Sequence, residues 1–306
     1  MSYTTIVVDK SHPAQFSTIH SAIDSVPANN QNWVIIKVKA GIYREKVMVP
    51  KNKRFIALIG EGMSNTKIIW NDHENLLESA TFHLLADDFV AVNITFENSY
   101  NHAEILEGNP IVPAAAAVVS GDRASFYNCS FYGLQDTLWD DEGRHYFKDC
   151  FIEGAMDFIC GNGQSLYENC EISVIDNQLE PNVKGFITAQ RRSSATEGTA
   201  FVFKECKING NGTAFLGRAW GPYSAVLFYK SYLSDVVEPE GWQPWNAIGH
   251  EENTMYAEQD NYGPGSDTSK RVRWMHKLDP STLQSYTNLS FINSDGWIQS
   301  QPTSSG

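Results

Sequence analysis

Short segments of alternating polar and apolar residues recur along the middle of the chain, and no other feature constrains its fold as strongly. In each segment a polar residue precedes a small apolar one, and the aligned small residues are Ile94, Cys129, Cys150, Cys170 and Cys206, with Ser231 as a candidate sixth. Successive positions lie 35, 21, 20 and 36 residues apart. One such strand cannot bury its apolar side alone, whereas strands stacked ~4.8 Å apart bury it together. Irregular repeats of this length predict a β-solenoid rather than a propeller, whose blades recur every ~40–50 residues.

Four of the five cysteines share the repeated position. Cysteine is among the residue types most often buried, so these side chains are predicted to form an internal stack of small apolar groups. A disulfide between adjacent coils is the alternative. The sequence has no close pairing of cysteine and histidine at the spacing that zinc sites use, so we expect no metal site.

The two ends of the chain differ from its repeating middle. Apolar residues at helical spacing precede Pro27, namely Phe16, Ile19, Ile23 and Val26. They predict a capping helix within residues 15–27. After Trp245 the repeat fades into a long polar stretch, then a short helical stretch near residues 281–286, so residues 246–306 are expected to form loops and helix. Nothing resembles a linker, and we predict one domain spanning residues 1–306.

The composition narrows the choice of partners. A net charge of −13 and a pI near 5.0 argue against nucleic acid and anionic membranes. Apolar runs such as residues 113–119 are far shorter than the ~20 residues of a membrane span. The polar, strand-like start MSYTTIVVDK differs from a signal peptide. Sequons for N-glycosylation permit a secreted origin; they begin at Asn93, Asn128, Asn211 and Asn288.

Two aspartates stand in the same register on successive repeats. Asp136 and Asp157 follow Cys129 and Cys150, respectively, by seven residues. If the cysteines stack, the two aspartates lie about one strand spacing apart, roughly 5 Å. Two carboxylates this close resist ionising together, so the pKa of one should rise and that of the other should fall. The pair suits an acid and an anion in one site, although exposed turn aspartates or the ~5–5.5 Å carboxylate pair of a retaining glycosidase fit the same spacing.

Six local sequences resemble those of pectin methylesterases, most closely the plant branch of that family. They are GIYREKV (41–47), QDTLW (135–139), MDFICGNG (156–163), ITAQRR (187–192), FLGRAWGPYS (215–224) and EGWQPW (240–245), in the family's order and spacing. The resemblance implies the family fold: an all-β, right-handed parallel β-helix with an N-terminal capping helix and long loops on one face. It also implies hydrolysis of the methyl esters of pectin, with no metal or organic cofactor.

The resemblance assigns roles to particular side chains. Asp157 matches the family nucleophile, which attacks the ester carbonyl of a galacturonate unit, and Asp136 matches the acid/base that protonates the departing methanol. Arg218 would pair with Asp157, and Gln135 would donate to the oxyanion. The residues expected to contact substrate are Trp220, Trp245, Phe158, Trp139 and Gln190.

Simpler interpretations exist for several residues outside the aspartate pair. Arg218 alone would be an ordinary surface arginine, and Trp220 and Trp245 would also suit a core. His145 is interpreted as a packed or surface histidine rather than a catalyst, and Glu45 of the first motif as structural.

One position breaks the family pattern. The family carries a second oxyanion glutamine 22 residues before the one in QDTL, and this chain has Pro113 there. Proline has neither a side-chain donor nor a backbone N–H, and the loss of an oxyanion donor costs ~10²–10³ in rate. Smaller departures are Cys160 for an aromatic residue and Ala219 for proline. A slow or inactive pectin-binding protein is therefore one alternative to an active esterase, and another β-helix glycosidase or lyase is a second.

The resemblance also implies a setting for the protein. We expect a secreted monomer of the cell wall that acts on pectin (homogalacturonan), with a proteinaceous inhibitor as a candidate partner and with no nucleic acid or membrane bound.

Overall fold

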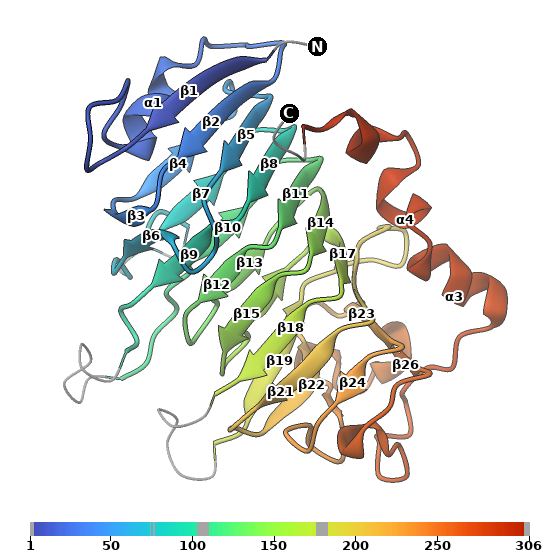
Figure 1. Ribbon diagram of the computed structural model, residues 1–306. Helices are drawn as coiled ribbons and strands as arrows, with labels where there is room; N and C mark the ends of the chain where they lie inside the picture. The colour runs from blue at the N-terminus through green and yellow to red at the C-terminus, as the bar shows by residue number, and fades with distance from the viewer. Residues whose placement is uncertain (1–2, 74, 76, 103–109, 176–182, 303–306) are drawn as a thin grey trace.

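A computed structural model describes residues 3–73, 75, 77–102, 110–175 and 183–302, and it shows a stack of coils in which the chain passes through three parallel sheets in turn (Figure 1). Each full coil adds one strand to sheet A, one to sheet B and one to sheet C. Sheet A contains β1 (Thr4–Val8), β2 (Val34–Val38), β5 (Ile56–Ile59), β8 (Phe89–Val92), β11 (Ala124–Tyr127), β14 (Arg144–Lys148), β17 (Gln164–Glu168), β20 (Ala200–Lys204), β23 (Ala225–Tyr229) and β26 (Met255–Gln259). The predicted β-solenoid is confirmed.

The other two sheets are built in the same parallel way. Sheet B contains β3 (Gly41–Arg44), β6 (Thr66–Trp70), β9 (Thr95–Asn98), β12 (Ser130–Tyr132), β15 (Phe151–Gly154), β18 (Glu171–Val174), β21 (Lys207–Gly210) and β24 (Tyr232–Leu233). Sheet C contains β4 (Val47–Val49), β7 (Phe82–Leu84), β10 (Ala117–Val119), β13 (Leu138–Asp140), β16 (Ile159–Gly161), β19 (Gly185–Gln190), β22 (Ala214–Ala219) and β25 (Trp242–Gln243).

Like residues stack on like inside the coils. Phe147 lies between Phe126 and Tyr167, with ring centroids 5.0 and 4.6 Å away and nearly parallel planes. These distances match the spacing of parallel strands, so the register of the strands in sheet A determines which side chains stack in the core. The repeat cysteines form a second stack, in which the Cys150 thiol, for example, donates to the Phe126 carbonyl at 3.3 Å. The four repeat cysteines share the main core cluster, which confirms the internal stack, and all five cysteines are free, which excludes the disulfide alternative.

The turn from sheet A to sheet B repeats one backbone conformation. The residue before each aligned small residue has a positive φ, and this set is Asn93, Asn128, Asp149, Asn169, Glu205 and Lys230. Asparagine and aspartate tolerate the left-handed region best, because their short polar side chains hydrogen-bond locally. Here they also bond to one another: the Asn128 side-chain amide donates to Asn93 at 2.6 Å. The polar residue of the sequence repeat is therefore a turn residue.

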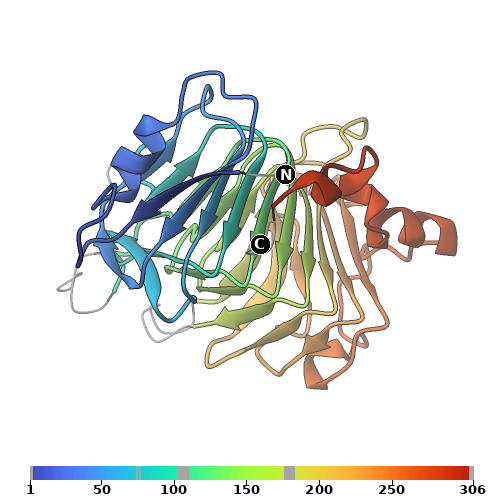
Figure 2. The same ribbon diagram turned by 45° about the horizontal axis from the view of Figure 1, so that its top comes forward.

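A helix closes the N-terminal end of the stack, as predicted. Helix α1 (Ile19–Ser25) buries Ile19, Ala22 and Ile23, and Figure 2 shows it at the end of the stack. The Glu45 carboxylate accepts hydrogen bonds from the backbone N–H groups of Ile19 and His20, both at 2.9 Å. Such N–H groups have no partner within a helix, so Glu45 stabilises the cap. This contact confirms the structural interpretation of Glu45.

The C-terminal region returns along the outside of sheet A. Helix α3 (Pro280–Thr287) contacts β20, helix α4 (Ser290–Asn293) contacts β17 and β14, and the 3₁₀ turn η4 (Trp297–Ser300) follows them back along the stack (Figures 1 and 2). The segment covers apolar side chains such as Leu166 and Val202. The Gln301 amide then donates to the carbonyls of Phe89 and Arg123. Helix α3 agrees with the predicted helical stretch.

The polar stretch after Trp245 contains a strand that the sequence did not suggest. Strand β26 pairs with β23 along its whole length and extends sheet A by one coil. The stretch also forms three 3₁₀ turns: η1 (Trp245–Ala247), η2 (Glu251–Asn253) and η3 (Pro264–Ser266). The Glu258 carboxylate on β26 forms a buried two-pronged ion pair with Arg271, at 2.8 and 3.0 Å. The expectation of a loop throughout this stretch is therefore wrong at β26.

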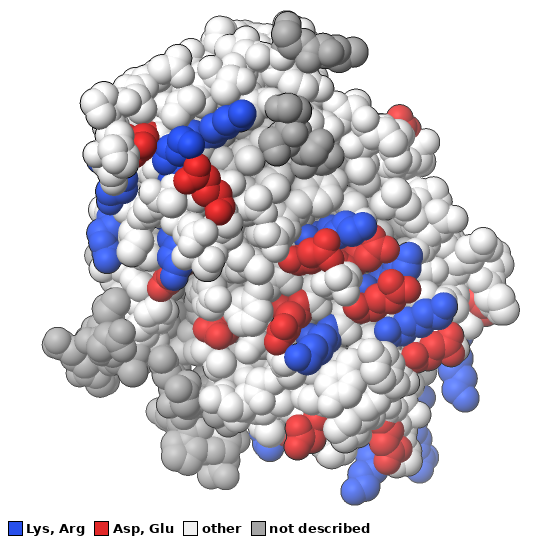
Figure 3. Space-filling view, viewed as in Figure 1, with Lys and Arg blue, Asp and Glu red and all other residues white. Residues whose placement is uncertain are grey.

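Charged side chains of both signs share the face seen in Figure 3. Several of them alternate across successive strands of sheet A, as where Glu168 lies between Lys148 (3.9 Å) and Lys204 (3.3 Å). Opposite charges on neighbouring strands reduce the repulsion within a chain of high net negative charge. Among the described residues, none of the helices has the length and apolar character needed to cross a bilayer.

Candidate active site

Asp136 and Asp157 lie side by side at the turn from sheet B to sheet C. Gln135 and Met156 form a parallel bridge, and the backbone N–H of Asp136 donates to the Met156 carbonyl at 3.1 Å. Both aspartates have left-handed backbones, with φ of 57° and 48°. Aspartate is one of the few residue types that enter this conformation readily, and strained positions of this kind gather at functional sites. The predicted stacking of the two aspartates is confirmed.

Arg218 on β22 reaches Asp157 from two coils away. Its Nε and Nη2 donate to the two carboxylate oxygens of Asp157, at 2.8 and 2.5 Å. The guanidinium carbon lies 4.0 Å from the centroid of the Trp245 ring and 4.3 Å from that of Phe186. A flat cation between two aromatic rings has little freedom to rotate, so Asp157 is held in one orientation.

The two carboxyl groups differ in their preference for a proton. Burial and the negative charge of Asp157 raise the pKa of Asp136 to about 8, although Arg218 opposes the rise. Burial also raises the pKa of Asp157, and its hydrogen bonds to Arg218 oppose that rise. The expected fall in the pKa of one aspartate is therefore wrong, because Asp157 is only 7% exposed and desolvation outweighs the arginine. Asp136 therefore keeps its proton near neutral pH, whereas Asp157 is paired with the Arg218 guanidinium.

Gln135 and the segment after Val112 flank the aspartates. The Gln135 side chain is half-buried, and among the described residues nothing hydrogen-bonds to its amide. One coil earlier, the backbone N–H of Ala114 donates to the Gln135 carbonyl at 3.2 Å. The Asn101 side chain holds Val112 by two hydrogen bonds, at 2.6 and 3.2 Å. Pro113 therefore lies between two fixed residues, on the coil next to Gln135.

Tryptophan side chains border the aspartate pair on the outer face of sheet C. Trp139 is 8% exposed and packs against Cys160, Val118 and Ala189, while its ring centroid lies 5.6 Å from that of Trp220. Trp245, in η1, is 39% exposed and stacks on Arg218. The site thus combines an ion-paired carboxylate, a carboxyl group of raised pKa and a border of apolar aromatic rings.

The sequence as a whole matches one known protein family. The model of the family described as pectinesterase matches residues 5–295. This chain belongs to the pectinesterase family. Probable pectinesterase 55 of Arabidopsis thaliana is 50% identical over 299 residues, which cover 97% of this chain and 91% of that protein. Probable pectinesterase 29 of the same plant is 49% identical over 299 residues, which cover 97% of this chain and 89% of that protein.

Solved pectin methylesterase structures share the fold. The enzyme from carrot superposes with a TM-score of 0.89 at 29% identity, covering 99% of this chain and 97% of the carrot chain. A deglycosylated enzyme from Aspergillus niger gives 0.81 at 27% identity, covering 98% of each chain. The predicted right-handed parallel β-helix and plant-type pectinesterase family are confirmed. The predicted carboxylic ester hydrolase is confirmed as well, and neither the inactive pectin-binding protein nor another carbohydrate enzyme is supported over it.

Two residues predicted to contact the pectinesterase substrate are placed elsewhere. Phe158 is fully buried in the main core, where it follows the left-handed turn at Asp157 and packs so closely on Gly154 that a side chain there would strike it. Gln190 is also fully buried, and its amide is occupied by Asn162 and by the backbone N–H of Ala225. Both predictions of a substrate contact are corrected: these side chains support the site from inside.

Other side chains at the site were missed in the sequence. Phe186 stacks on Phe215 and on Arg218, and the Met156 sulfur accepts a weak contact from Arg218 at 3.7 Å. Arg191 lies over the Trp220 ring and bonds to Asp141. Met156 and Arg191 both lie within the recognised motifs MDFICGNG and ITAQRR. The sequence alone does not show which side chains they contact.

His145 is a core residue, as interpreted. It is fully buried, with Nδ1 2.5 Å from an Asp140 carboxylate oxygen and Nε2 2.9 Å from the Gly121 carbonyl. Tyr167 donates to the other Asp140 oxygen at 2.6 Å. Burial opposes protonation, but Asp140 outweighs it and raises the His145 pKa. The network joins the end of sheet C to sheet A beneath the site.

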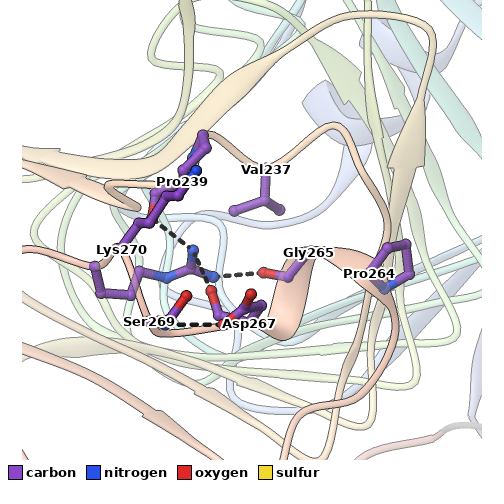
Figure 4. Close-up of a pocket in the computed structure, with 8 residues that line it drawn as sticks. Val237, Pro239, Pro264, Gly265, Asp267, Ser269 and Lys270 are labelled. Carbon is purple, nitrogen blue, oxygen red and sulfur yellow. Dashed lines mark hydrogen bonds between the residues drawn. The ribbon is translucent and has the colours of Figure 1, made fainter.

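A separate pocket lies beyond the last full coil. Figure 4 shows it between Val237, Pro239 and the segment from Pro264 to Lys270, where Arg271 donates to the Gly265 and Pro239 carbonyls. None of the predicted site residues lines it. Within the described part of the chain, no group of three or more histidine, cysteine, aspartate or glutamate side chains is arranged to hold a metal ion.

Proposed function

We propose that the chain hydrolyses the methyl esters of galacturonate units in pectin through an acyl-enzyme on Asp157. The observation that carries this mechanism is the two-pronged hydrogen bonding of Arg218 to Asp157 beside Asp136, whose pKa is raised to about 8. One group is an oriented anion and the other is an acid near neutral pH. Nucleophilic catalysis with a neighbouring acid/base requires this division.

Each step uses groups that are in place. An Asp157 oxygen attacks the ester carbonyl, the bond to the methoxy oxygen breaks, and Asp136 gives its proton to that oxygen to release methanol. Asp136, now ionised, takes a proton from water as the water oxygen attacks the acyl carbon. The bond to Asp157 then breaks, which frees the galacturonate carboxyl group and restores both aspartates. Gln135, whose amide is unoccupied, donates to the oxyanion in both steps.

The remaining site residues bind and orient substrate. Trp220 and Trp245 offer partly exposed ring faces to the sugars, and Trp139 forms the apolar floor between them and Asp136. Apolar sugar faces pack well on indole rings, which present a large rigid surface. Arg218 acts on Asp157 and contributes no separate contact to the ester.

Methanol release from highly methylated pectin tests the proposal directly. We expect methanol to appear with an equal amount of free carboxylate, and no new reducing or unsaturated ends. Binding of pectin without methanol would instead indicate a protein without turnover, and new chain ends would indicate a glycosidase or lyase.

The rate should depend on pH in a bell shape. Asp136 must be protonated to release methanol, so kcat/KM should fall as the pH rises through about 8. Asp157 must be ionised to attack, so kcat/KM should also fall as the pH drops towards its pKa, which lies above the ordinary value of 3.8. The measurement is methanol release from methylated oligogalacturonate, with alkaline hydrolysis subtracted. An Asp149→Asn variant, altered at an aspartate outside the site, should keep both limbs. Full activity well above pH 9 in the wild type would contradict the role of Asp136.

Replacing Pro113 should raise the turnover number. Pro113 stands where the family carries a second oxyanion glutamine, and its neighbours are fixed against Gln135 and Asn101. A donor aimed at the oxyanion acts mainly in the transition state, so Pro113→Gln should raise kcat more than it lowers KM. We expect a gain of up to ~10²-fold, measured as steady-state methanol release on one defined pectin.

Pro113→Met is the matched control, because methionine has nearly the length of glutamine without its N–H donors. It should leave kcat near the wild-type value. An equal rise in both variants would assign the effect to the backbone freed from proline, and no rise in a folded Pro113→Gln variant would mean that the segment does not point to the oxyanion.

The wider setting also remains a proposal. The chain would be a single-domain monomer secreted to the cell wall, where a proteinaceous inhibitor is a candidate partner. Family membership supports pectin as the substrate.

A further inference from the structure

Three polar side chains form a network inside the stack, at the corner where the chain passes from sheet C to sheet A. Asp140 ends β13, His145 lies on β14 and Tyr167 lies on β17, and all three are fully buried. One Asp140 carboxylate oxygen lies 2.5 Å from His145 Nδ1, and the other accepts from the Tyr167 hydroxyl at 2.6 Å. The proposed reaction uses none of these groups, which are called the Asp140 network below.

The contacts of His145 determine how many protons its ring carries. Nε2 lies 2.9 Å from the Gly121 carbonyl oxygen, which has no hydrogen to give, so Nε2 must donate. A second proton lies between Nδ1 and the Asp140 oxygen, because two lone pairs would repel each other at 2.5 Å. The hydrogen bond from Tyr167 stabilises Asp140 as a carboxylate, so this second proton belongs to His145. The ring is therefore an imidazolium.

No second cation is in place to neutralise Asp140. Within the part of the chain that the structure describes, its one ion pair is with His145. The other charged or titratable groups near the pair are matched among themselves or neutral: Asp122, which is ion-paired with Arg123 and Arg144, the Tyr167 hydroxyl and the Cys160 thiol, whose pKa is raised by burial. Beside His145 on β17, the buried Ser165 hydroxyl has no hydrogen-bond partner among the described residues. Removing the proton from His145 would therefore leave the Asp140 charge buried and unpaired, which is costly.

We propose that the Asp140 network is a pH-sensitive element of the fold, which ties β13 to sheet A while His145 is an imidazolium and weakens when the ring gives its proton to water. Burial opposes the charge on His145, but Asp140 outweighs it and raises the His145 pKa above its ordinary value of 6.5, in agreement with the contacts. The affected coil is the one that carries Asp136, since β13 begins two residues after that aspartate. The inference goes beyond the proposed function, because it concerns the stability of the fold.

The Asp140 network predicts how the stability of the protein depends on pH. Below pH 6.5, both the folded and the unfolded chain hold the His145 proton, so the stabilisation is complete. Above pH 6.5, the unfolded chain releases this proton while the folded chain keeps it. The equilibrium constant for unfolding should therefore rise with pH, by up to about tenfold per pH unit, until His145 titrates in the folded chain as well.

Asp140→Asn should reverse the sign of this pH dependence. The asparagine oxygen can accept from Tyr167 and its amide can donate to His145 Nδ1, so the variant should fold with a neutral ring. Burial then lowers the His145 pKa with no carboxylate to outweigh it, so the contribution of His145 should make the unfolding constant fall as the pH rises to about 6.5. Denaturant unfolding from about pH 5 to about pH 9 measures both effects. The difference between variant and wild type removes the contributions of the seven other histidines.

Asp149→Asn is the matched control, because it makes the same substitution at an exposed aspartate outside the network, and it should keep the wild-type pH dependence. Nitrogen-15 NMR of histidine-labelled wild type needs no variant. At neutral pH the buried ring, identified by slow exchange of its N–H protons with solvent, should carry a proton on both nitrogens.

Two results would overturn the inference. One is a single protonated nitrogen on the buried ring of the wild type at neutral pH, and this measurement decides alone if Asp140→Asn does not fold. The other is a folded Asp140→Asn variant whose stability follows the wild-type pH dependence. Neither measurement needs turnover, so absence of methanol release from the wild type would count against the proposed function alone.

Discussion

Asp157→Asn should lower kcat for methanol release by at least about 10³-fold, because the substitution removes the attacking anion and keeps the size of the side chain. Asparagine also tolerates the left-handed backbone at this position, where φ is 48°. The amide oxygen can still accept from Arg218, so the turn should persist. Steady-state methanol release on a defined pectin measures the loss, with the thermal unfolding midpoint as the check on folding.

Asp149→Asn is the matched control for that change. Asp149 has the same backbone conformation, with φ of 55°, and accepts a hydrogen bond from the Asn169 side chain in the turn from sheet A to sheet B. Its substitution makes the same chemical change outside the site and should leave kcat unaltered. A fold-competent Asp157→Asn variant that keeps near-wild-type turnover would remove Asp157 from the role of nucleophile.

The aspartate pair could be placed from the sequence because a solenoid converts sequence register into spatial contact. Once the repeat cysteines were aligned, Asp136 and Asp157 had to meet, since each follows its cysteine by the same number of residues. The repeat also predicted the solenoid, whereas apolar residues at helical spacing predicted the capping helix. The pairing of Arg218 with Asp157 came from the resemblance instead, because β22 is two coils away along a variable repeat.

Side-chain direction next to the turns could not be read in the same way. Alternation along a strand predicts which side chains face outwards, but a left-handed residue resets it, and Phe158 therefore points into the core directly after Asp157. Gln190 ends a strand whose every residue is buried, and the contact that captures its amide, Asn162, comes from another coil. Such contacts depend on the lengths of turns and loops, which set the relative position of segments far apart in sequence.

Strand β26 is an example of a whole strand that the sequence does not predict. Its residues, MYAEQ, show weak alternation and lie between polar stretches, so their sequence does not predict a strand. They become one because β23 offers an unpaired edge and the buried ion pair of Glu258 with Arg271 fixes the segment on it. Tertiary context decides the conformation here.

Arg218→Lys should lower kcat by about 10²-fold or more, although the charge is retained. The guanidinium makes two hydrogen bonds to Asp157, at 2.8 and 2.5 Å, and is stacked between Trp245 and Phe186. A lysine ammonium cannot reproduce the paired donors or the flat stacked face. Each charge-assisted hydrogen bond lost is worth ~1.5–3 kcal/mol, and 1.36 kcal/mol of barrier is tenfold in rate. If Arg218 orients Asp157 for attack, as proposed, the loss should appear in kcat with KM little changed.

Arg144→Lys is the matched control, because it makes the same substitution at an arginine that pairs with an aspartate outside the site. Arg144 makes the same two-pronged contact, to Asp122 at 3.0 and 2.8 Å, on β14 of sheet A. Its replacement should cost some stability and leave kcat unchanged. If both lysine variants lost activity in parallel with their unfolding midpoints, Arg218 would be a structural residue. A selective loss in Arg218→Lys, with a normal midpoint, assigns to this guanidinium the task of keeping Asp157 ionised and aimed at the ester.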